Sequence, residues 1–431
     1  MDSRSIFVFL FFCILIMSFK ESVSTRVTTE ANLRTLLWTT NSYDSLVRPD
    51  DTVNVTIKLY PMSLLDLDIA EGSMTAVGFF TFEWTDSRLD WSSNAAYSSI
   101  ITMFTTGKYT WFPSLVLLNS IDELDILMDP DNQNPIRVAN DGSCEYLMLK
   151  VMKVSCDTYA TYYPFDTQTC RLVIASWGYN EAEIAFVTKG VSTSFYIENG
   201  EWEYTGDAEK SKAITRGHQQ VPTLSFDLTF RRRPIYQVLN IFLPTVMIGF
   251  LISGAFVLPP DSGERMGYSL TTLLAYAVYL TMAADSLPTV SLNVAYLSIY
   301  LNITVVSGGA VVVLSKIVLS CHHASEDDPI PTFLVKMYTG WAGQLAGMRK
   351  MQCFWNKNTK ETNVVDVKEQ TTESNNEDLE TQKEMEINWP IITKFLDKLF
   401  FRFFLLITIL QQIVFGIIFL YGYLCACNPD S

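Results

Sequence analysis

Two hydrophobic patterns divide the chain near residue 233. Before that point, short runs of alternating apolar and polar residues are separated by clusters of Gly, Pro, Asn and Asp. The clearest runs are 53–59, 76–84, 146–154 and 224–230. About ten such runs within roughly 200 residues predict an all-β sandwich. After that point come four long apolar segments, at about 235–258, 266–284, 292–319 and 400–424.

Each apolar segment is close to the ~20 residues that cross a bilayer. We therefore expect a bundle of four transmembrane helices. Three arginines, Arg231 to Arg233, precede the first span, where the positive-inside rule favours the cytosol. A long translocated domain outweighs that rule, because such domains cross regardless of charge. Both termini are then expected outside the cell.

The start of the chain predicts a cleaved secretory signal peptide. Residues 6–19 form a short apolar run after Arg4, and the small residue Ser24 follows. This run is too short for a convincing span. The predicted domains are a signal peptide at 1–24, an extracellular β domain at 25–233, transmembrane helices one to three at 234–319, a cytoplasmic insert at 320–398, a fourth transmembrane helix at 399–424 and an extracellular tail at 425–431.

Helical patterns are also expected outside the spans. Residues 29–43 predict a short amphipathic helix, and 331–348 predict an amphipathic helix at the membrane surface. Residues 359–376 are polar, charged and poor in aromatics, which predicts a disordered insert. Pro390 lacks a backbone donor, so it predicts a kink or a helix start near Asn388.

The second apolar segment carries a stripe of less apolar residues at helical spacing. From end to end the stripe reads Glu264, Gly267, Thr271, Leu274, Val278, Met282 and Asp285. The opposite side carries Tyr268, Leu273, Tyr276 and Tyr279. A helix buried in a bundle is an alternative, but it does not explain a carboxylate at each end of one stripe. The pattern favours a helix that lines a pore.

Charge and reactive residues narrow the possible functions. The formal net charge is -15, and residues 25–233 carry 27 acids and 17 bases, or -10. Acidic mouths of a pore concentrate cations, although ordinary solubility charge is the alternative. The spacing of His and Cys predicts no metal site, and no catalytic or phosphate-binding motif suggests an enzyme. Asn54-Val55-Thr56 predicts glycosylation at Asn54, and Cys144 is expected to be a buried free thiol.

Two segments carry a family resemblance. Residues 156–170 read CDTYATYYPFDTQTC, and residues 258–291 read LPPDSGERMGYSLTTLLAYAVYLTMAADSLPTVS. Both resemble the Cys-loop receptors, which are pentameric ligand-gated channels, and their nicotinic acetylcholine receptor branch in particular. The resemblance implies an extracellular immunoglobulin-like sandwich, a four-helix transmembrane bundle and cytoplasmic helices. It also implies a disulfide between Cys156 and Cys170.

The resemblance implies that the stripe lines the ion path. Nicotinic channels carry Lys where this chain has Arg265, and anion-selective relatives carry a Pro-Ala insertion that this chain lacks. Glu264 therefore favours cations, whereas Arg265 should point about 100° away from the axis. Rings of Leu274 and Val278 are expected to gate by dewetting. Gly267 departs from the usual Thr or Ser.

The expected agonist pocket departs from the nicotinic pattern. Trp177 and Phe79 stand at aromatic positions of the cation-binding box, whereas Leu118 and Val221 stand where the family has Tyr. Tyr204 begins the arm that should cap the agonist, and this arm lacks the adjacent cysteine pair. Acetylcholine is therefore not the expected agonist, and Trp177 serving only structure is an alternative. Arg216 and His218 on the same arm offer an alternative, an anionic or zwitterionic ligand, but exposed charge on a loop is usually only solvated.

Coupling between pocket and pore is expected at the domain junction. Arg232 aligns with the family's Arg before the first span. It is expected to pair with Asp166, or with an acid near Asp68 and Glu71. The loop at Pro288 would receive the movement.

The leading interpretation is a cation-selective pentameric channel of the plasma membrane. Its expected partners are identical or related subunits, an unknown small-molecule agonist, membrane lipid and permeant cations, with no nucleic acid and no cofactor. One alternative is an accessory subunit that binds no agonist and works within a heteropentamer. Another is an anion-selective channel, which Glu264 and Asp285 argue against.

Overall fold

The computed structural model describes residues 26–122, 125–128, 134–216, 219–285, 294–325, 328–347 and 388–427. The signal peptide, the insert at 359–376, His218 and Pro288 lie outside the described residues. The chain divides into two compact units. A β unit comprises Met1–Pro234 with Ser286–Asn293 and Gly422–Ser431, and a helical unit comprises Ile235–Asp285 with Val294–Tyr421.

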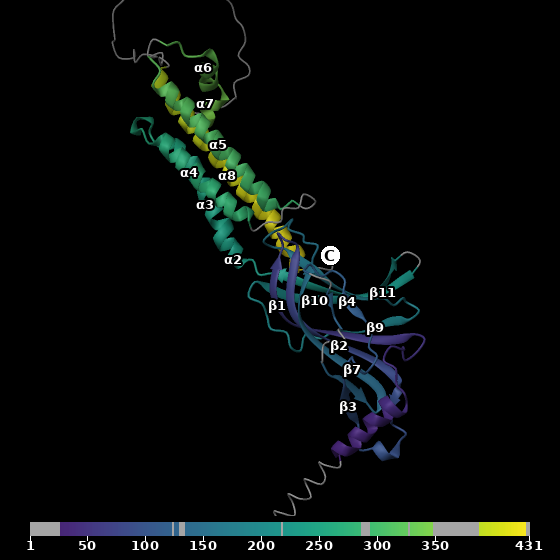
Figure 1. Ribbon diagram of the computed structural model, residues 1–431. Helices are drawn as coiled ribbons and strands as arrows, with labels where there is room; N and C mark the ends of the chain where they lie inside the picture. The colour runs from purple at the N-terminus through teal and green to yellow at the C-terminus, as the bar shows by residue number, and fades with distance from the viewer. Residues whose placement is uncertain are drawn as a thin grey trace, which may run out of the picture. The chain divides into compact units, whose positions relative to one another are not determined.

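The β unit contains two sheets, as the alternating pattern predicts (Figure 1). The six-stranded sheet has the order β3 (Thr102–Thr105), β6 (Ile136–Ala139), β7 (Asp141–Ser155), β2 (Ser73–Asp90), β1 (Val53–Asp68) and β9 (Ile184–Val191). The five-stranded sheet has the order β10 (Trp202–Arg216), β11 (Gln219–Arg232), β8 (Thr167–Ser176), β4 (Leu115–Leu117) and β5 (Asp125–Ile126). All neighbouring strands are antiparallel except β1 and β9. The predicted sandwich is confirmed.

Strand β7 shows how the pattern builds the core. Tyr146, Met148 and Met152 are buried, whereas Leu147 and Leu149 between them are exposed. Successive side chains of a strand point to opposite faces, so one face packs inward and the other stays open. The outward face of this strand is apolar, which is unusual for a surface.

The N-terminal helix packs onto the β unit by the expected face. Residues 26–34 are α-helical and continue into the π-helical turn η1 (Thr35–Thr40). Leu33 and Leu37 are fully buried, as the amphipathic pattern predicts, and Leu36 is half-buried. A short 3-10 helix, η2 (Ala95–Tyr97), follows β2.

The helical unit follows the predicted segments closely. The first segment is a run of α2 (Ile235–Gln237), η3 (Val238–Phe242), α3 (Leu243–Ser253) and η4 (Gly254–Phe256). The turn η5 (Pro260–Ser262) leads to α4 (Arg265–Ala284), which precedes α5 (Tyr296–His322). The remaining helices are α6 (Thr332–Thr339), α7 (Trp341–Leu345) and α8 (Trp389–Cys427). Helix α8 begins one residue after Asn388, near the predicted start.

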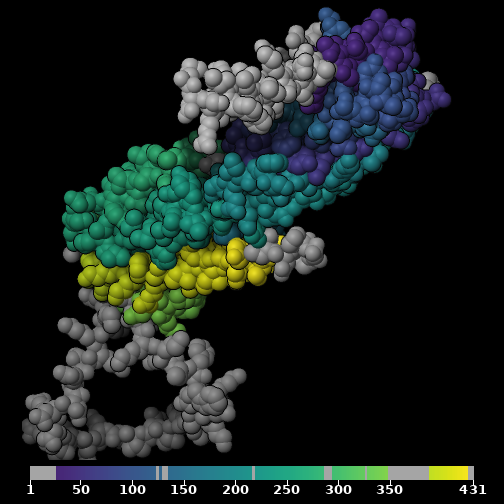
Figure 2. Space-filling view, turned by 90° about the horizontal axis from the view of Figure 1, so that it is seen from below, coloured from purple at the N-terminus to yellow at the C-terminus, as the bar shows by residue number. Residues whose placement is uncertain are grey.

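Three helical segments of the described chain are long and apolar enough to cross a membrane, namely Ile235–Phe256, Tyr296–His322 and Trp389–Cys425. Helix α4 is not among them, because its 20 residues include Arg265, four hydroxyl residues and three tyrosines. Hydrogen bonds also join α8 to α5. Gln411 of α8 donates to the Tyr300 carbonyl and the Thr304 hydroxyl of α5, at 3.0 and 2.7 Å. Figure 2 shows α8 in yellow along one side of the helical unit.

The expected surface helix at 331–348 is divided into α6 and α7 at Gly340. Leu334, Tyr338 and Ala342 pack into one cluster with Val318 of α5 and Phe395 of α8. Phe333 and Trp341 remain exposed. The division buries one apolar face against the bundle and leaves a second apolar face open.

Candidate pore and ligand-binding sites

Two predicted ligand residues, Trp177 and Val221, lie at one end of the five-stranded sheet, and Leu118 lies further along it. Trp177 directly follows β8, and its amide donates to the Ser114 carbonyl at 2.9 Å. Leu118 directly follows β4, and its amide donates to the Val173 carbonyl at 2.7 Å. Because β11 pairs with β8 through Thr223 and Ala175, continuing this register sets Val221 level with Trp177. The side chains of Trp177 and Leu118 are both exposed.

Tyr204 lies at the other end of the same sheet. It pairs with Phe230 in the β10–β11 register, nine positions from Val221 on β11. At ~3.3 Å per residue this separates it from the Trp177 end by roughly 30 Å. Its hydroxyl donates to Asp207 at 2.7 Å, and burial together with this bond raises the pKa of Tyr204. The structure therefore does not bring Tyr204 together with Trp177.

Arg216 is the last residue of β10 and pairs with Gln219 of β11. Its position is at the Trp177 end of the sheet, because Ile214 of the same strand pairs with Val221. The pairing of β10 with β11 thus places the backbone of Arg216 at the same end of the sheet as the predicted pocket.

Phe79 belongs to an aromatic cluster on the six-stranded sheet. Its ring stacks on Tyr60 with centroids 4.4 Å apart, and Phe195 lies 5.6 Å away. The ammonium of Lys58 is 4.8 Å from the Tyr60 ring centre. Aromatic faces attract cations, and the Lys58 ammonium is the cation that lies against this cluster. Sequence reasoning missed Tyr60 and Phe195; the only signal was an aromatic residue in each of two adjacent strands.

A pocket of about 560 Å³ opens on this sheet as well. Its lining consists of Phe104, Asn134, Pro135, Arg137, Glu145, Leu147 and Leu149. Leu149 is the register partner of Phe79, so the pocket adjoins the aromatic cluster on one face. A guanidinium and a carboxylate, Arg137 and Glu145, lie 3.9 Å apart in its wall. The lining combines apolar surface with both signs of charge.

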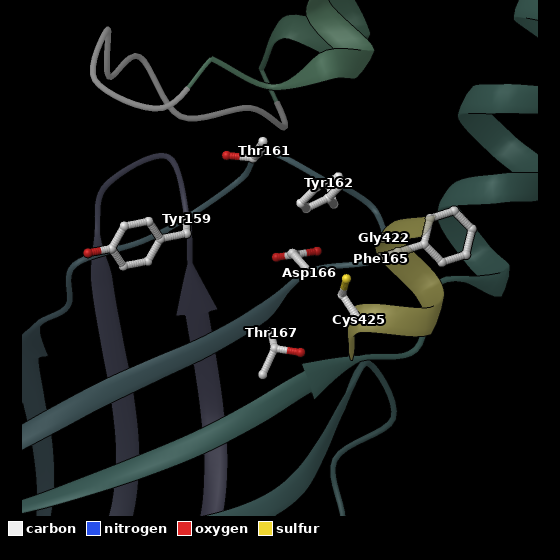
Figure 3. A pocket seen from close by; sticks show the side chains of 8 residues that line it. All are labelled: Tyr159, Thr161, Tyr162, Phe165, Asp166, Thr167, Gly422 and Cys425. Carbon is white, nitrogen blue, oxygen red and sulfur yellow. The ribbon is translucent and has the colours of Figure 1, made fainter. Parts of the chain in front are cut away.

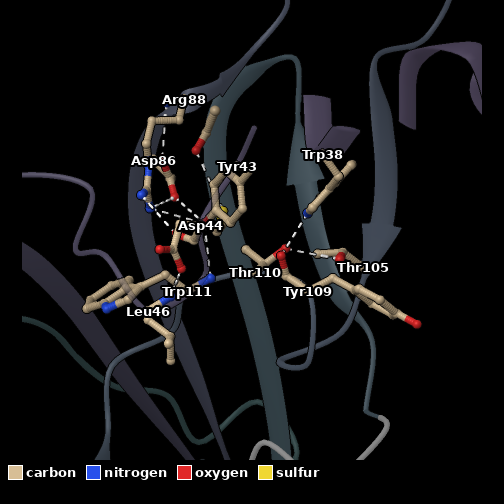
Figure 4. Close-up of polar contacts among 12 residues, drawn as sticks. Trp38, Tyr43, Asp44, Leu46, Asp86, Arg88, Thr105, Tyr109, Thr110 and Trp111 are labelled. Carbon is tan, nitrogen blue, oxygen red and sulfur yellow. Dashed lines mark hydrogen bonds and ion pairs between the residues drawn. The ribbon is translucent and has the colours of Figure 1, made fainter. Parts of the chain in front are cut away.

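A buried polar network fixes the chain between the N-terminal helix and β2 (Figure 4). Asp86 is fully buried and accepts from the Tyr43 hydroxyl at 2.7 Å and from the Arg88 guanidinium at 2.9 and 2.7 Å. The Trp111 amide donates to the Tyr43 oxygen at 3.0 Å. Burial, with the bond to Asp86, raises the pKa of Tyr43. Cys144 is buried and free, as predicted, and burial raises the pKa of its thiol.

The segment 156–170 closes through the expected disulfide, Cys156–Cys170. Within it Asp166 is buried and accepts from Arg232 Nε at 2.9 Å. The Arg232 guanidinium also pairs with Glu201, and it lies 4.0 Å from the ring centre of Trp202 and 5.1 Å from that of Tyr163. Burial raises the pKa of Tyr163 to about 12. Of the acids considered for Arg232, Asp166 is the one it contacts.

A smaller pocket of about 280 Å³ lies beside this segment, within the β unit (Figure 3). It is lined by Tyr159, Thr161, Tyr162, Phe165, Asp166, Thr167, Gly422 and Cys425. The Phe165 ring packs edge-on against Tyr423, with centroids 5.9 Å apart. The tip of the Cys156–Cys170 segment is thus aromatic on its outer side.

Helix α4 leaves the predicted stripe uncovered within the helical unit. Leu274, Val278 and Met282 are 65%, 55% and 65% exposed, and Glu264, Gly267, Thr271 and Asp285 are exposed too. A Cβ added to Gly267 would meet nothing within 4 Å. The buried residues of α4 are Arg265, Ser269, Tyr276 and Ala283. Of the side predicted to pack, Tyr276 is buried and Tyr268, Leu273 and Tyr279 are half-buried, whereas Leu270 and Thr281 outside the stripe are exposed as well.

Two sequence comparisons identify these features. Residues 31–234 match the family described as neurotransmitter-gated ion-channel ligand binding domain. Residues 241–383 match the neurotransmitter-gated ion-channel transmembrane region. The chain belongs to the neurotransmitter-gated ion channels, the Cys-loop receptors. The family consists of ion channels rather than enzymes.

Similar curated proteins lie within the nicotinic branch. Acetylcholine receptor subunit beta of Rattus norvegicus is 32% identical over 311 residues, which are 66% of this chain and 60% of the relative. Neuronal acetylcholine receptor subunit alpha-9 of Gallus gallus is 30% identical over 298 residues, which are 67% and 60%. Subunit alpha-9-I of Oncorhynchus mykiss is 30% identical over 299 residues, which are 67% and 51%. This Cys-loop receptor subunit thus spans about 60% of the length of the first two relatives and about half of the third.

Proposed function

We propose that the chain is a subunit of a pentameric, cation-selective ligand-gated channel of the plasma membrane, with an agonist other than acetylcholine. The observation that carries this proposal is the open stripe of α4. One helix cannot enclose an ion path, whereas five copies of such a helix can. A helix that lines water needs polar residues that a lipid-facing helix lacks, and α4 carries them.

Electrostatics supports cations as the permeant ions. In the pentamer, five Glu264 carboxylates ring one mouth of the path and five Asp285 carboxylates ring the other. At ~5 Å each carboxylate attracts a central monovalent cation by ~0.8 kcal/mol even in water, so five give roughly 4 kcal/mol before salt screening. Arg265, the nearest cation in sequence, is buried and projects about 100° around the helix from Glu264.

Assembly is supported by the outward face of the six-stranded sheet. Leu147, Leu149 and Val151 of β7 are all exposed on that face. Contiguous exposed apolar surface marks interaction sites, and neighbouring subunits supply the cover. Glycosylation at Asn54, which is exposed on β1, is compatible with a secreted domain.

The agonist pocket is proposed at the Trp177 end of the five-stranded sheet. Trp177 supplies an exposed aromatic ring, but Val221 level with it is aliphatic, and so is Leu118, which lies level with Val173 four residues along β8. A box with one aromatic wall holds a quaternary ammonium weakly. The same observation favours the second candidate function, an accessory subunit within a heteropentamer.

Expression of the full chain alone tests both candidates. We expect pentamers in detergent by mass measurement, and reversal potentials that follow the sodium and potassium gradients. A Leu274→Thr substitution, which wets the constriction, supplies current without an agonist. Currents that track chloride would overturn the cation proposal. Monomers or dimers alone would overturn homopentamer assembly and favour the accessory subunit.

Glu264 is tested by removal. Glu264→Ala together with a Pro-Ala insertion before it removes the ring attraction and should shift the reversal potential toward chloride. Asp285→Ala is the matched control, because that mouth is expected to be wider and better screened by solvent. It should lower conductance without reversing selectivity. An unchanged reversal potential after the Glu264 change would remove Glu264 from the selectivity ring.

A further inference from the structure

The first residue of α4 is a charged side chain held inside the helical unit. Arg265 is 1% exposed, and its Nε donates to the Ala255 carbonyl of η4 at 3.1 Å. Its Nη2 donates to the Phe256 carbonyl at 3.4 Å and to the carboxylate of Asp397 on α8 at 2.5 Å. The base of α4 is therefore tied to the end of the first segment and to α8 by one guanidinium.

The contacts of Arg265 are incomplete in a way that argues against a purely stabilising role. Its Nη1 is buried and has no hydrogen-bond partner among the described atoms. A buried ion pair is weak evidence for stability, because apolar residues of similar volume often serve as well. What a guanidinium supplies and an apolar side chain does not is a directed set of contacts.

Glu264 is the residue directly before Arg265, and it is exposed where Arg265 is buried. Consecutive helical residues project about 100° apart, and the Glu264 backbone is already near-helical at φ -94° and ψ -8°. Fixing the direction of Arg265 therefore fixes the direction of Glu264. No rotation of the first turn of α4 is possible without breaking the contacts of the buried guanidinium.

A second contact holds the other side of Glu264. Asp261 in η5 lies 2.6 Å from Nε2 of His322 at the end of α5. Gly263, between Asp261 and Glu264 in the chain, has a φ of +69°, in the left-handed region that favours glycine. Glu264 thus sits between one anchor on α5 and one anchor on α8.

We propose that Arg265 and Asp397 are positioning residues that aim the Glu264 ring at the ion path. The proposal rests on the proposed cation channel. Asp397 serves as the counter-charge that keeps Arg265 away from the path. Without it, the guanidinium relaxes toward water at the mouth, adds positive charge beside the Glu264 ring and frees the first turn of α4.

The test compares Asp397→Asn with Lys394→Gln in the full chain carrying Leu274→Thr. Lys394 is exposed on α8 three residues before Asp397, so its neutralisation changes the charge of the same helix and leaves Arg265 paired. We expect Asp397→Asn to lower the sodium-to-chloride permeability ratio at least threefold, Lys394→Gln to leave it unchanged, and Asp397→Glu to restore most of it. An unchanged ratio in Asp397→Asn would show a merely structural role.

A second readout separates this proposal from the cation proposal and needs no current. A Glu264→Cys variant is purified and spin-labelled at the new cysteine. The protein without this substitution is labelled in the same way, to measure the signal from the other thiols. Distances between labels on neighbouring subunits should broaden in Asp397→Asn and stay narrow in Lys394→Gln. If Asp397→Asn does not fold, Arg265→Gln replaces it with the same expectation. Equally narrow distances in all variants would overturn the positioning role, whichever ion the channel conducts.

Discussion

Two buried arginines, one in each unit, are held in contrasting ways. Arg232 of the β unit has two carboxylates, Asp166 and Glu201, and two aromatic rings around it. Arg265 of the helical unit has one carboxylate, two carbonyls and one aromatic ring, that of Phe256 at 5.7 Å, and one of its nitrogens has no partner among the described atoms. The side chains of both arginines are less than 5% exposed.

The contrast teaches that burial of charge serves two purposes. At Arg232 the contacts exceed what one guanidinium requires, so the loss of one contact leaves others in place. At Arg265 there is a single carboxylate and one nitrogen already has no hydrogen-bond partner among the described atoms, so a displacement that breaks the contact with Asp397 leaves the guanidinium without a counter-charge. The first arrangement suits a joint that must persist, and the second suits a residue whose direction matters.

The largest expected effect comes from removing Arg232. Arg232→Met leaves Asp166 buried without a cation, and breaking a buried pair in this way costs roughly 3–5 kcal/mol. We expect little full-length protein at the cell surface and an early loss of the pentamer peak on heating in detergent. Arg233→Met is the matched control, since Arg233 pairs at the surface with exposed Glu198. Normal assembly of the Arg232→Met variant would contradict the view that the buried Arg232–Asp166 pair stabilises the β unit.

The next effect concerns the segment that carries Asp166. Cys156→Ser opens a disulfide between residues 14 apart, and a loop of this length contributes ~3 kcal/mol. Asp166 would then approach Arg232 from a less restricted segment. Surface labelling of pentamers should fall strongly, while Cys144→Ser, which touches no disulfide, should change it little. Unaltered surface assembly would show that the disulfide is dispensable.

An intermediate effect is expected at the buried carboxylate of Asp86. Tyr43→Phe removes a hydroxyl that donates to Asp86 and accepts from the Trp111 amide. Because an unsatisfied buried group costs ~1–3 kcal/mol, the melting midpoint of the purified protein should fall measurably. Asp86 retains Arg88, so the protein should still fold. A midpoint equal to that of the parent would mean that water replaces the hydroxyl.

The smallest effect sharpens the contrast most. Glu201→Gln removes the half-exposed second carboxylate of Arg232, and a screened pair of this kind is worth ~0–1 kcal/mol. Arg232 keeps Asp166 and both rings, so heating curves should nearly coincide with those of the parent. A loss as large as that of Arg232→Met would show that Arg232 has no spare contacts.

The sequence predicts most of the architecture because periodicity reports it directly. Alternation predicts the two-sheet unit, and the residues of the predicted stripe on α4 are exposed, together with others such as Leu270. The start of α8 near Asn388 is predictable because its cause is local, namely the missing backbone donor of Pro390. Cys156–Cys170 and the Arg232–Asp166 contact were both expected from the resemblance to the family and are present.

What the sequence does not predict depends on contacts between distant residues. Arg265 and Asp397 are 132 positions apart, and no local pattern joins them. The cluster of Tyr60, Phe79 and Phe195 likewise depends on which strands pair and on the conformation of the segment after β9. Tyr204 seemed part of the pocket because the capping arm begins there, but strand length carries it to the far end of the sheet.

The length of α8 has a consequence for the surrounding lipid. Its 39 residues extend about 58 Å at 1.5 Å per residue, so one continuous helix joins the predicted span 399–424 to Asp397 outside it. A rigid helix answers a thinner bilayer by tilting rather than by shortening. Asp397 belongs to this helix, so a tilt of α8 pulls on Arg265 and on the first turn of α4. In the proposed channel, hydrophobic mismatch is therefore expected to act on the mouth of the ion path, so channel recordings should control bilayer thickness.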